Sequence, residues 1–374
     1  MRPRVLVTGV TGFVGREVAR GLLRAGRTVT VLARARDGVS AGARVAAAVG
    51  VTPDDERVSV IEGDLAAPDC GVGGADWPRL RASVVSVIHC AGDTAFAPER
   101  LEPFEAGHVG GPCRLLEGLA AGRLRRFVHV STAYVCGQRE GLILESDGDK
   151  GQSFHNVYER VKLASEAALR DAGARAGVDV LIARPAIVVG PAPLTGGGAP
   201  SNLFFDFVRL AATLATLTSG RHLTLRIEAA GSAPFNVVPV DYVAAALIHL
   251  ADSATDAETF HLVAHDAPTQ AEVLGTISDR LGVRGLTLVD TLDDETALER
   301  RVARLLRGYR EYLRQRVVFD DTNARRALPG ELARRATLSP TALHALIDLA
   351  LTTEAPSGAR PPTRRPIEAT RGSR

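Results

Sequence analysis

Short apolar runs of strand length alternate with helical patterns along the first half of the chain. The runs lie at residues 5–7, 28–33, 58–65, 84–92, 127–134 and 178–185. Buried strands that alternate with helices build a parallel sheet covered by helices on both faces. The pattern therefore predicts an α/β fold, a doubly wound parallel sheet of the Rossmann type, with ligands at the carboxyl ends of its strands.

The pattern changes in the second half. Residues 191–200 are rich in Pro and Gly and are predicted to form a loop over the substrate entrance. The apolar helical stretch at 202–218 suits an apolar substrate, but it equally suits a core or dimer helix. Apolar runs at 235–240 and 259–263 predict strands that return to the main sheet, with a helix at 241–250 after the first of them.

These changes give the domain boundaries. We expect a cofactor-binding Rossmann core over residues 1–190 and a smaller, mostly helical, substrate-side subdomain over 191–352. Residues 353–374 are rich in Pro, Arg, Ser and Thr and offer little to bury, so we expect a disordered tail there.

Composition narrows the class of protein. The chain has 374 residues and 45% hydrophobic content, which suffices for one large core with an appended subdomain. Its longest apolar runs are too short to span a bilayer and its N-terminus lacks a signal-peptide pattern, so we expect a cytoplasmic protein away from membranes. A net charge of only +2 argues against a nucleic-acid surface. The scattered cysteines show no metal-ligand spacing, so no metal site is expected.

The strongest local signal is the glycine-rich stretch after the first strand. Gly9 allows a tight turn, Gly12 lets the backbone approach a pyrophosphate, and Gly15 permits close packing of the following helix. The residues of this stretch predicted to line a dinucleotide are Gly9, Thr11, Gly12, Phe13, Val14, Gly15 and Arg16.

The next strand ends indicate which dinucleotide is bound. Arg34 and Arg36 follow the second strand, where a 2′-phosphate calls for Arg and a 2′-hydroxyl calls for a carboxylate. Arg16 is within reach of the same phosphate, so NADP is favoured over NAD. The third strand ends at Asp64 and Leu65, which are placed to approach adenine. The fourth strand ends in the small residues Cys90, Ala91 and Gly92, against which the cofactor can lie.

Lys162 is one of only two lysines in an Arg-rich chain, and it follows Tyr158 by four residues. That spacing is one helical turn, so both side chains share a face. An ammonium beside a phenol favours phenolate and can still reach a ribose hydroxyl. Taken alone, the pair is also typical of an ordinary amphipathic helix.

Together these motifs resemble an extended short-chain dehydrogenase/reductase. The stretches Thr8–Gly15, His89–Gly92, Ser131–Ala133, Tyr158–Lys162 and Arg184–Pro185 occur in the order and spacing of that superfamily. The chain is most similar to its thioester reductase and fatty acyl-CoA reductase branch, the male sterility branch, over residues 4–265.

The resemblance implies roles for individual residues. Tyr158 would donate the proton to a carbonyl oxygen, Lys162 would lower the pKa of Tyr158 and bind the nicotinamide ribose, and Thr132 would polarise the same carbonyl. Residues around Pro185, Ile187 and Val188 would line the nicotinamide. The predicted catalytic residues are Thr132, Tyr158, Lys162 and His108.

His108 is a departure from the family pattern. It stands where relatives carry an Asn that holds a relay water for the Lys, and Gly111 replaces a Thr three residues later. An imidazole can shuttle a proton itself, because its pKa lies near neutrality. It can equally be a packed residue in an altered site, and the sequence leaves both open.

Three functions follow. The first is NADPH-dependent reduction of an apolar carbonyl, in its specific form an acyl thioester on CoA or on a separate acyl carrier protein, to aldehyde or alcohol. The second is a ketone or hydroxyl oxidoreductase, or a nucleotide-sugar epimerase or dehydratase. The third is a non-catalytic NADPH-binding sensor. A homodimer is common in the superfamily and is a further expectation.

Overall fold

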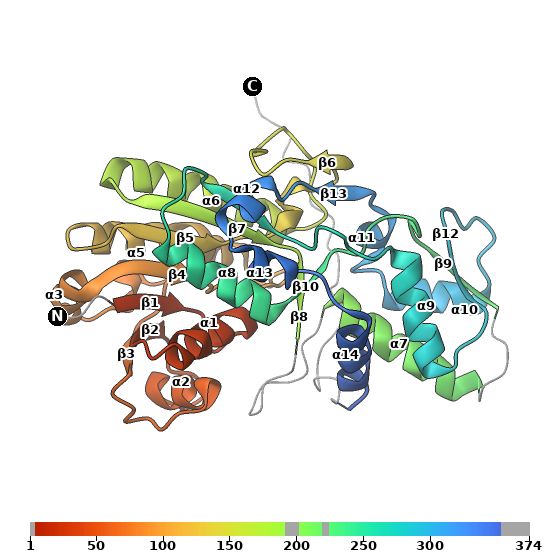
Figure 1. Ribbon diagram of the computed structural model, residues 1–374, viewed down its shortest axis with the longest axis horizontal. Helices are drawn as coiled ribbons and strands as arrows, with labels where there is room; N and C mark the ends of the chain where they lie inside the picture. The colour runs from red at the N-terminus through yellow and green to blue at the C-terminus, as the bar shows by residue number, and fades with distance from the viewer. Residues whose placement is uncertain (1–3, 191–201, 219–223, 353–374) are drawn as a thin grey trace.

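The computed structural model describes residues 4–190, 202–218 and 224–352. Within them, seven parallel strands form the main sheet in the order β11-β7-β5-β4-β1-β2-β3 (Figure 1). These strands are β1 (Arg4–Thr8), β2 (Val29–Ala33), β3 (Val58–Glu62), β4 (Val84–His89), β5 (Arg126–Val130), β7 (Asp179–Pro185) and β11 (Thr259–Leu262). The predicted doubly wound α/β sheet is confirmed.

Helices cover both faces of this sheet because its strands are apolar on both sides. In β1, Val5 and Val7 point into one core, and Leu6 points into the core on the opposite face. The first core is covered by α1 (Phe13–Arg24), α2 (Ala41–Val49) and α8 (Val240–Asp252). The second is covered by α3 (Asp76–Ser83), α5 (Gly111–Ala120) and α6 (Val157–Ala176).

A second lobe has its own core beside the sheet (Figure 1). It contains α7 (Leu203–Thr218), α9 (Gln270–Leu281), α10 (Ala297–Leu305), α11 (Arg310–Arg314), α14 (Pro340–Thr352) and the paired strands β9 (Leu225–Glu228) and β12 (Leu286–Val289). Phe204 and Phe205 of α7 are completely buried in this core. The apolar stretch at 202–218 therefore serves packing, which was one of the two predicted uses.

The apolar run at 235–240 was predicted to return to the main sheet, and this prediction is wrong. Residues 259–263 join the main sheet as β11, whereas β10 (Val237–Pro239) pairs with β8 (Ile187–Val189) in a separate two-stranded sheet. The reason is that β7 already has β5 and β11 on its two sides. The chain bends after β7 at Ala186, whose N–H binds Leu262 O, and β8 continues beyond the sheet edge to meet β10.

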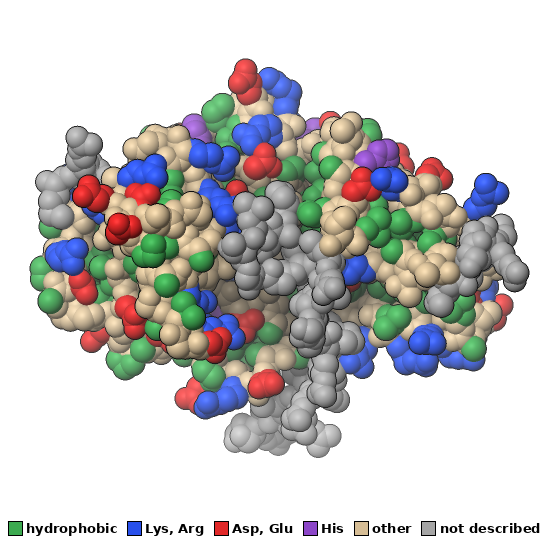
Figure 2. All heavy atoms as spheres, turned by 90° about the horizontal axis from the view of Figure 1, so that it is seen from below, with side chains coloured by type: hydrophobic (Ala, Val, Ile, Leu, Met, Phe, Trp, Pro, Cys, Tyr) green, Lys and Arg blue, Asp and Glu red, His purple; other side chains and the backbone are tan. Residues whose placement is uncertain are grey.

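Short elements complete the described residues. They are β6 (Gly141–Ile143), which pairs with β13 (Val317–Phe319), α4 (Leu101–Glu105), α12 (Thr322–Ala327), α13 (Gly330–Arg334) and the single turns η1 (Pro68–Gly71), η2 (Ala106–Gly110) and η3 (Ala133–Cys136). On the face seen in Figure 2, acidic and basic side chains are interspersed over the Rossmann lobe. The predicted loop at 191–200 and the predicted tail at 353–374 lie outside the described residues.

Candidate active site

The turn between β1 and α1 is so tight that only glycine fits at two positions. Gly9 has a left-handed backbone, with φ +73°, and a Cβ there would lie 2.6 Å from the backbone nitrogen of Ala91. A Cβ on Gly15 would lie 2.4 Å from Gly9 O. Helix α1 begins at Phe13, its N-cap Gly12 provides no side-chain cap, and its first turn has no acidic residue. This helix N-terminus suits an anion such as a dinucleotide diphosphate.

Three further residues of this stretch lie in or beside the first turn of α1. Thr11 is exposed, Val14 is partly buried and Arg16 is buried. Arg16 Nε has no hydrogen-bond partner among the described residues, and Glu17 Oε1 lies 4.0 Å from it. Burial lowers the pKa of Arg16. A buried guanidinium with an unused donor fits an anionic ligand.

Arg34 and Asp64 meet beyond the ends of β2 and β3. Arg34 Nη1 lies 3.5 Å from Asp64 Oδ2, and both side chains are exposed. Asp64 Oδ1 also accepts from Ala66 N at 3.0 Å, and the carbonyl of Leu65 accepts from Arg114 at 2.7 Å. The residues predicted to contact adenosine are therefore brought together at one edge of the sheet.

Thr8 joins the ends of β1 and β4. Its hydroxyl lies 2.9 Å from His89 Nδ1 and accepts from Ala91 N at 3.1 Å. Cys90 lies between these residues, and burial raises the pKa of its thiol to about 12. The thiol is thus protonated and unreactive, which suits a wall of the cofactor site rather than a nucleophile.

Tyr158 and Lys162 lie one turn apart at the start of α6. Asn156 caps this helix, because its Oδ1 accepts from Glu159 N at 3.0 Å. Lys162 is only 3% exposed, and its Nζ donates to Val130 O at the end of β5 over 2.6 Å. Burial lowers the pKa of Lys162 to about 8. The ammonium is thereby fixed where α6 meets the carboxyl edge of the sheet.

Tyr158 carries a neutral phenol at pH 7. Burial raises its pKa, and the charge of neighbouring Glu159 raises it further. The resemblance implied that Lys162 would lower this pKa. In the protein alone the effect of burial is the largest, and the Lys162 ammonium is hydrogen-bonded to Val130 O and His129.

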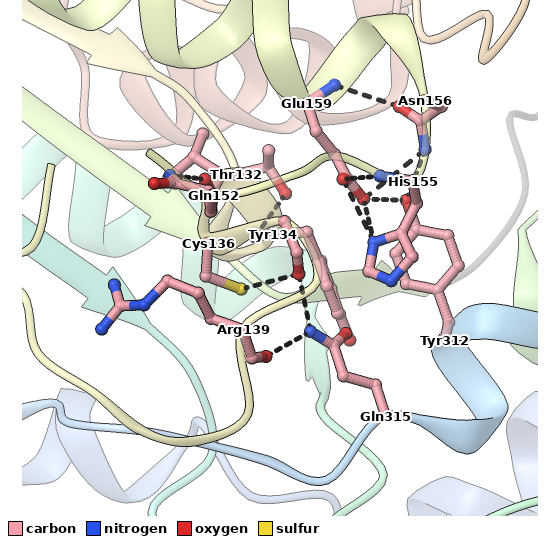
Figure 3. Close-up of polar contacts among 12 residues, drawn as sticks. Thr132, Tyr134, Cys136, Arg139, Gln152, His155, Asn156, Glu159, Tyr312 and Gln315 are labelled. Carbon is pink, nitrogen blue, oxygen red and sulfur yellow. Dashed lines mark hydrogen bonds and ion pairs between the residues drawn. The ribbon is translucent and has the colours of Figure 1, made fainter. Parts of the chain in front are cut away.

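Thr132 follows β5 and is 8% exposed. Its Oγ1 accepts from Tyr134 N at 3.3 Å and so caps η3 (Figure 3). Because the hydroxyl acts only as an acceptor in this bond, its proton is available to a carbonyl oxygen. The neighbouring Ser131 Oγ is buried and has no partner among the described residues.

His108 lies in η2, a single π-helical turn. Its Nε2 lies 2.9 Å from Asp93 O and 3.1 Å from Asp93 N, and its ring packs against Phe104 with centroids 4.4 Å apart. The Tyr158 ring meets it edge-on at 6.1 Å. A Cβ on Gly92 would lie 2.8 Å from His108 Cε1. Burial lowers the pKa of His108 to about 4, so the ring is neutral and packed in this arrangement.

The glycine at position 111 also has a packing reason. A Cβ on Gly111 would lie 2.5 Å from Leu65 O and 2.9 Å from Leu65 Cβ. A threonine at this position, as the family resemblance implies, would therefore clash with Leu65, which follows β3.

Three predicted nicotinamide contacts lie where β7 passes into β8. Pro185 is buried, and Ile187 and Val188 are partly buried. The position of β8 is fixed from the second lobe, because Asn202 Nδ2 donates to Val188 O at 3.0 Å and Ile187 N donates to Asn236 O at 3.1 Å.

Sequence reasoning missed two groups of residues around the pair on α6. His89 and His129 occupy paired positions on β4 and β5. The signal for them was a histidine at the end of each apolar run, since His89 is the last residue of β4 and His129 the last but one of β5. Tyr312 of α11 donates to Glu159 and accepts from Asn156 Nδ2 at 2.7 Å (Figure 3). No local pattern predicts this last contact, because it joins segments more than a hundred residues apart.

The geometry can now be compared with known proteins. The sequence model of the male sterility protein family, an NAD-binding family, matches residues 7–247. The chain belongs to this family. The predicted resemblance to the thioester reductase and male sterility branch is confirmed, and the chain has the NAD(P)-binding domain that the glycine-rich turn predicted.

The curated relatives include carboxylic acid reductases. That of Segniliparus rugosus is 27% identical over 278 residues, which is 67% of this chain and 23% of the relative. That of Mycobacterium tuberculosis is 27% identical over 367 residues, or 90% of this chain and 29% of the relative. The chain thus spans less than a third of the length of these relatives. The prediction of an oxidoreductase agrees with their names.

Solved structures share the fold. The terminal R domain from the myxalamid PKS-NRPS biosynthetic pathway has a TM-score of 0.72 at 21% identity. The match covers 94% of this chain and 92% of the R-domain chain. UDP-glucuronic acid 4-epimerase from Bacillus cereus, solved with NAD, has a TM-score of 0.64 at 16% identity and covers 93% and 96%.

None of the helices in the described residues is long and apolar enough to cross a membrane. The same residues contain no group of three or more His, Cys, Asp or Glu side chains that could hold a metal ion.

Proposed function

We propose that this chain is an NADPH-dependent reductase of an apolar carbonyl, and specifically of an acyl thioester. The observation that carries the proposal is the Lys162 ammonium, buried at the carboxyl edge of the sheet one helical turn from the neutral phenol of Tyr158. A buried cation beside a proton donor is what carbonyl reduction with a nicotinamide requires. The carboxylic acid reductase relatives support acyl groups as substrates.

The reduction needs one hydride and one proton for each carbonyl. Bound NADPH supplies the hydride. Tyr158 gives its phenolic proton to the carbonyl oxygen, and the Thr132 hydroxyl donates a hydrogen bond to that oxygen and polarises it. Lys162 binds the nicotinamide ribose through an ammonium hydrogen. With a thioester, the resulting hemithioacetal would lose its thiol to give an aldehyde. Reduction of the aldehyde to an alcohol would take a hydride from a second NADPH and a second proton through Tyr158.

The preference for NADP rests on two arginines. Arg34 lies exposed after β2, and the buried Arg16 has an unused Nε in the first turn of α1. Both cations suit a 2′-phosphate, and Asp64 is already paired with Arg34. Titration with NADPH and NADH tests this preference, which is contradicted by equal or tighter binding of NADH.

Of the two roles open for His108, we propose the packed one. Its Nε2 is bound to the backbone of Asp93, and Gly92 covers its ring. The ring therefore shapes the loop after β4. The variant His108→Gln is expected to keep most of kcat, and a loss as large as that of Tyr158→Phe would favour the proton shuttle.

The thioester would be carried by CoA or by an acyl carrier protein. Purified protein should therefore be mixed with NADPH and a panel of acyl-CoAs, carrier-bound acyl groups, aldehydes and cyclic ketones, while the loss of reduced-nicotinamide absorbance is followed. Oxidation of NADPH with thioesters is expected. Turnover confined to ketones would remove the thioester as substrate, and tight NADPH binding without any turnover would favour a sensor. Light scattering tests the expected homodimer.

A further inference from the structure

A buried imidazole touches the Lys162 ammonium from the sheet side. His129 Nε2 lies 3.2 Å from Lys162 Nζ, and the His129 side chain is completely buried on β5. The next residue, Val130, supplies the carbonyl that accepts from the same Nζ at 2.6 Å. The lysine is therefore held by two adjacent positions of one strand.

The number of hydrogens on Lys162, His129 and Ser165 decides which atoms donate and which accept. An ammonium only donates, so His129 Nε2 accepts from Lys162 and the proton of the ring resides on Nδ1. Ser165 Oγ also lies near this nitrogen, at 3.4 Å. Its single proton goes to the carbonyl of His108 at 2.6 Å, because a carbonyl can only accept. The Nε2 lone pair is thus left to the lysine.

A second imidazole fixes the ring of His129. His89 is the partner of His129 on β4, and the two rings stack with centroids 5.3 Å apart and planes 16° apart. His89 is in turn held by Thr8, whose Oγ1 lies 2.9 Å from its Nδ1. The orientation of the acceptor is therefore set by the same residue that ends β1 at the glycine-rich turn.

The charged and titratable groups around this contact keep both imidazoles neutral. Burial and the Lys162 charge lower the pKa of His129 and of His89 well below their usual value. The other groups that bear electrostatically on Lys162 or on the two imidazoles are Glu166, Cys90, His108 and Arg170. His129 is thus a neutral acceptor throughout the range in which Lys162 titrates.

We propose that His129 is the positioning residue of Lys162, and that with Val130 O it binds two of the three ammonium hydrogens and leaves one for the nicotinamide ribose. The inference rests on the proposed function of the Tyr158 and Lys162 pair. It places the polar partner of the lysine on β5, inside the sheet. The histidine at position 108, where relatives carry asparagine, is bound to Asp93 instead.

The two lysines of the chain allow a direct test without turnover. Protein labelled with ¹³C and ¹⁵N in lysine shows two side-chain signals, and Lys150→Arg assigns them. The titration of Lys162 is then followed by NMR in the wild type, in His129→Leu and in His129→Gln. An acceptor stabilises the charged amine. Its loss in His129→Leu should therefore lower the pKa of Lys162 by about one pH unit or more. The amide oxygen of glutamine in His129→Gln can replace Nε2 as the acceptor, so the pKa of Lys162 should return most of the way to its wild-type value.

Ser165→Ala is the matched control, because this buried side chain neighbours His129 without contacting Lys162. This variant should leave the pKa of Lys162 at its wild-type value. The proposal is overturned if folded His129→Leu keeps the wild-type pKa of Lys162, or if Ser165→Ala lowers that pKa as much as His129→Leu does. Where His129→Leu does not fold, His129→Phe takes its place, because a phenyl ring can still stack on His89 but offers no acceptor to Lys162. The proposed function fails separately, through absence of NADPH oxidation by the wild type.

Discussion

At the residue scale, the proposed reaction needs a neutral phenol on Tyr158 and a charged ammonium on Lys162, one helical turn apart. The phenol has to stay neutral until hydride arrives, and burial secures this by raising its pKa. The ammonium has to stay charged, and burial works against it by lowering its pKa to about 8. Glu166, whose charge raises the pKa of Lys162, partly offsets the burial.

This balance predicts a pH limit on activity. Because the folded pKa of Lys162 is depressed, the charged form is present below about pH 8 and is lost as pH rises through that value. We expect kcat/KM for NADPH oxidation to fall about tenfold for each pH unit above this point. A profile that stays flat from pH 7 to about pH 10, near the unperturbed value for lysine, would contradict the role of the ammonium.

Loss of the phenolic hydroxyl of Tyr158 is predicted to slow the chemical step without weakening NADPH binding. Tyr158→Phe should lower kcat by about 10² to 10⁴-fold, the usual contribution of a positioned acid, while the Kd for NADPH stays within about twofold. Tyr134→Phe is the control, because this partly buried tyrosine follows Thr132 in η3 and its ring packs against Tyr312. Equal losses in the two variants, or a large loss of NADPH binding in Tyr158→Phe, would mean that Tyr158 is a structural residue.

At the element scale, the glycine-rich turn and helix α6 were predictable because their chemistry is local. Gly9 and Gly15 are imposed by contacts within a few residues or with the adjacent strand, and the spacing from Tyr158 to Lys162 is one helical turn. The course of β10 was not predictable. Its apolar sequence fits any sheet, and only the neighbours of β7 decide that it pairs with β8.

The turn gives a prediction with an internal control. Gly15→Ala places a Cβ 2.4 Å from Gly9 O, so the turn must open; we expect a loss of about 1–3 kcal/mol in unfolding free energy and weaker NADPH binding. Gly42→Ala, in α2, meets nothing within 4 Å and should stabilise by about 0.5–1 kcal/mol. Urea unfolding and a fluorescence titration measure both effects. NADPH affinity unchanged in Gly15→Ala would argue against cofactor binding at this turn.

At the scale of the whole molecule, the second lobe reaches helix α6 through α11. Tyr312 binds Glu159 and Asn156 at the start of α6, and its ring contacts Phe96 with centroids 5.8 Å apart, in the segment after β4. The sequence could not predict this junction, since nothing near Tyr312 marks its distant partners.

The junction predicts that a change in the second lobe slows the chemistry. Tyr312→Phe leaves the buried carboxylate of Glu159 without one donor, which should cost about 1–3 kcal/mol of stability. It should also lower kcat, because the N-terminus of α6 carries Tyr158. Tyr309→Phe, which loses a bond to Asp206 inside the second lobe, is the control and should lower stability without the same fall in kcat. Equal kcat values in both variants would show that the junction has no catalytic consequence.

In the proposed function, hydride passes from NADPH to an acyl carbonyl in the site of Tyr158 and Lys162. This transfer can be followed with NADPH dideuterated at C4 of the nicotinamide, an acyl-CoA, and mass spectrometry of the product. We expect an aldehyde or alcohol with deuterium on the former carbonyl carbon, one thiol released for each acyl group, and label transfer slowed by about 10²-fold or more with Tyr158→Phe. Unlabelled product, or label transfer that persists at the wild-type rate in Tyr158→Phe, would contradict it.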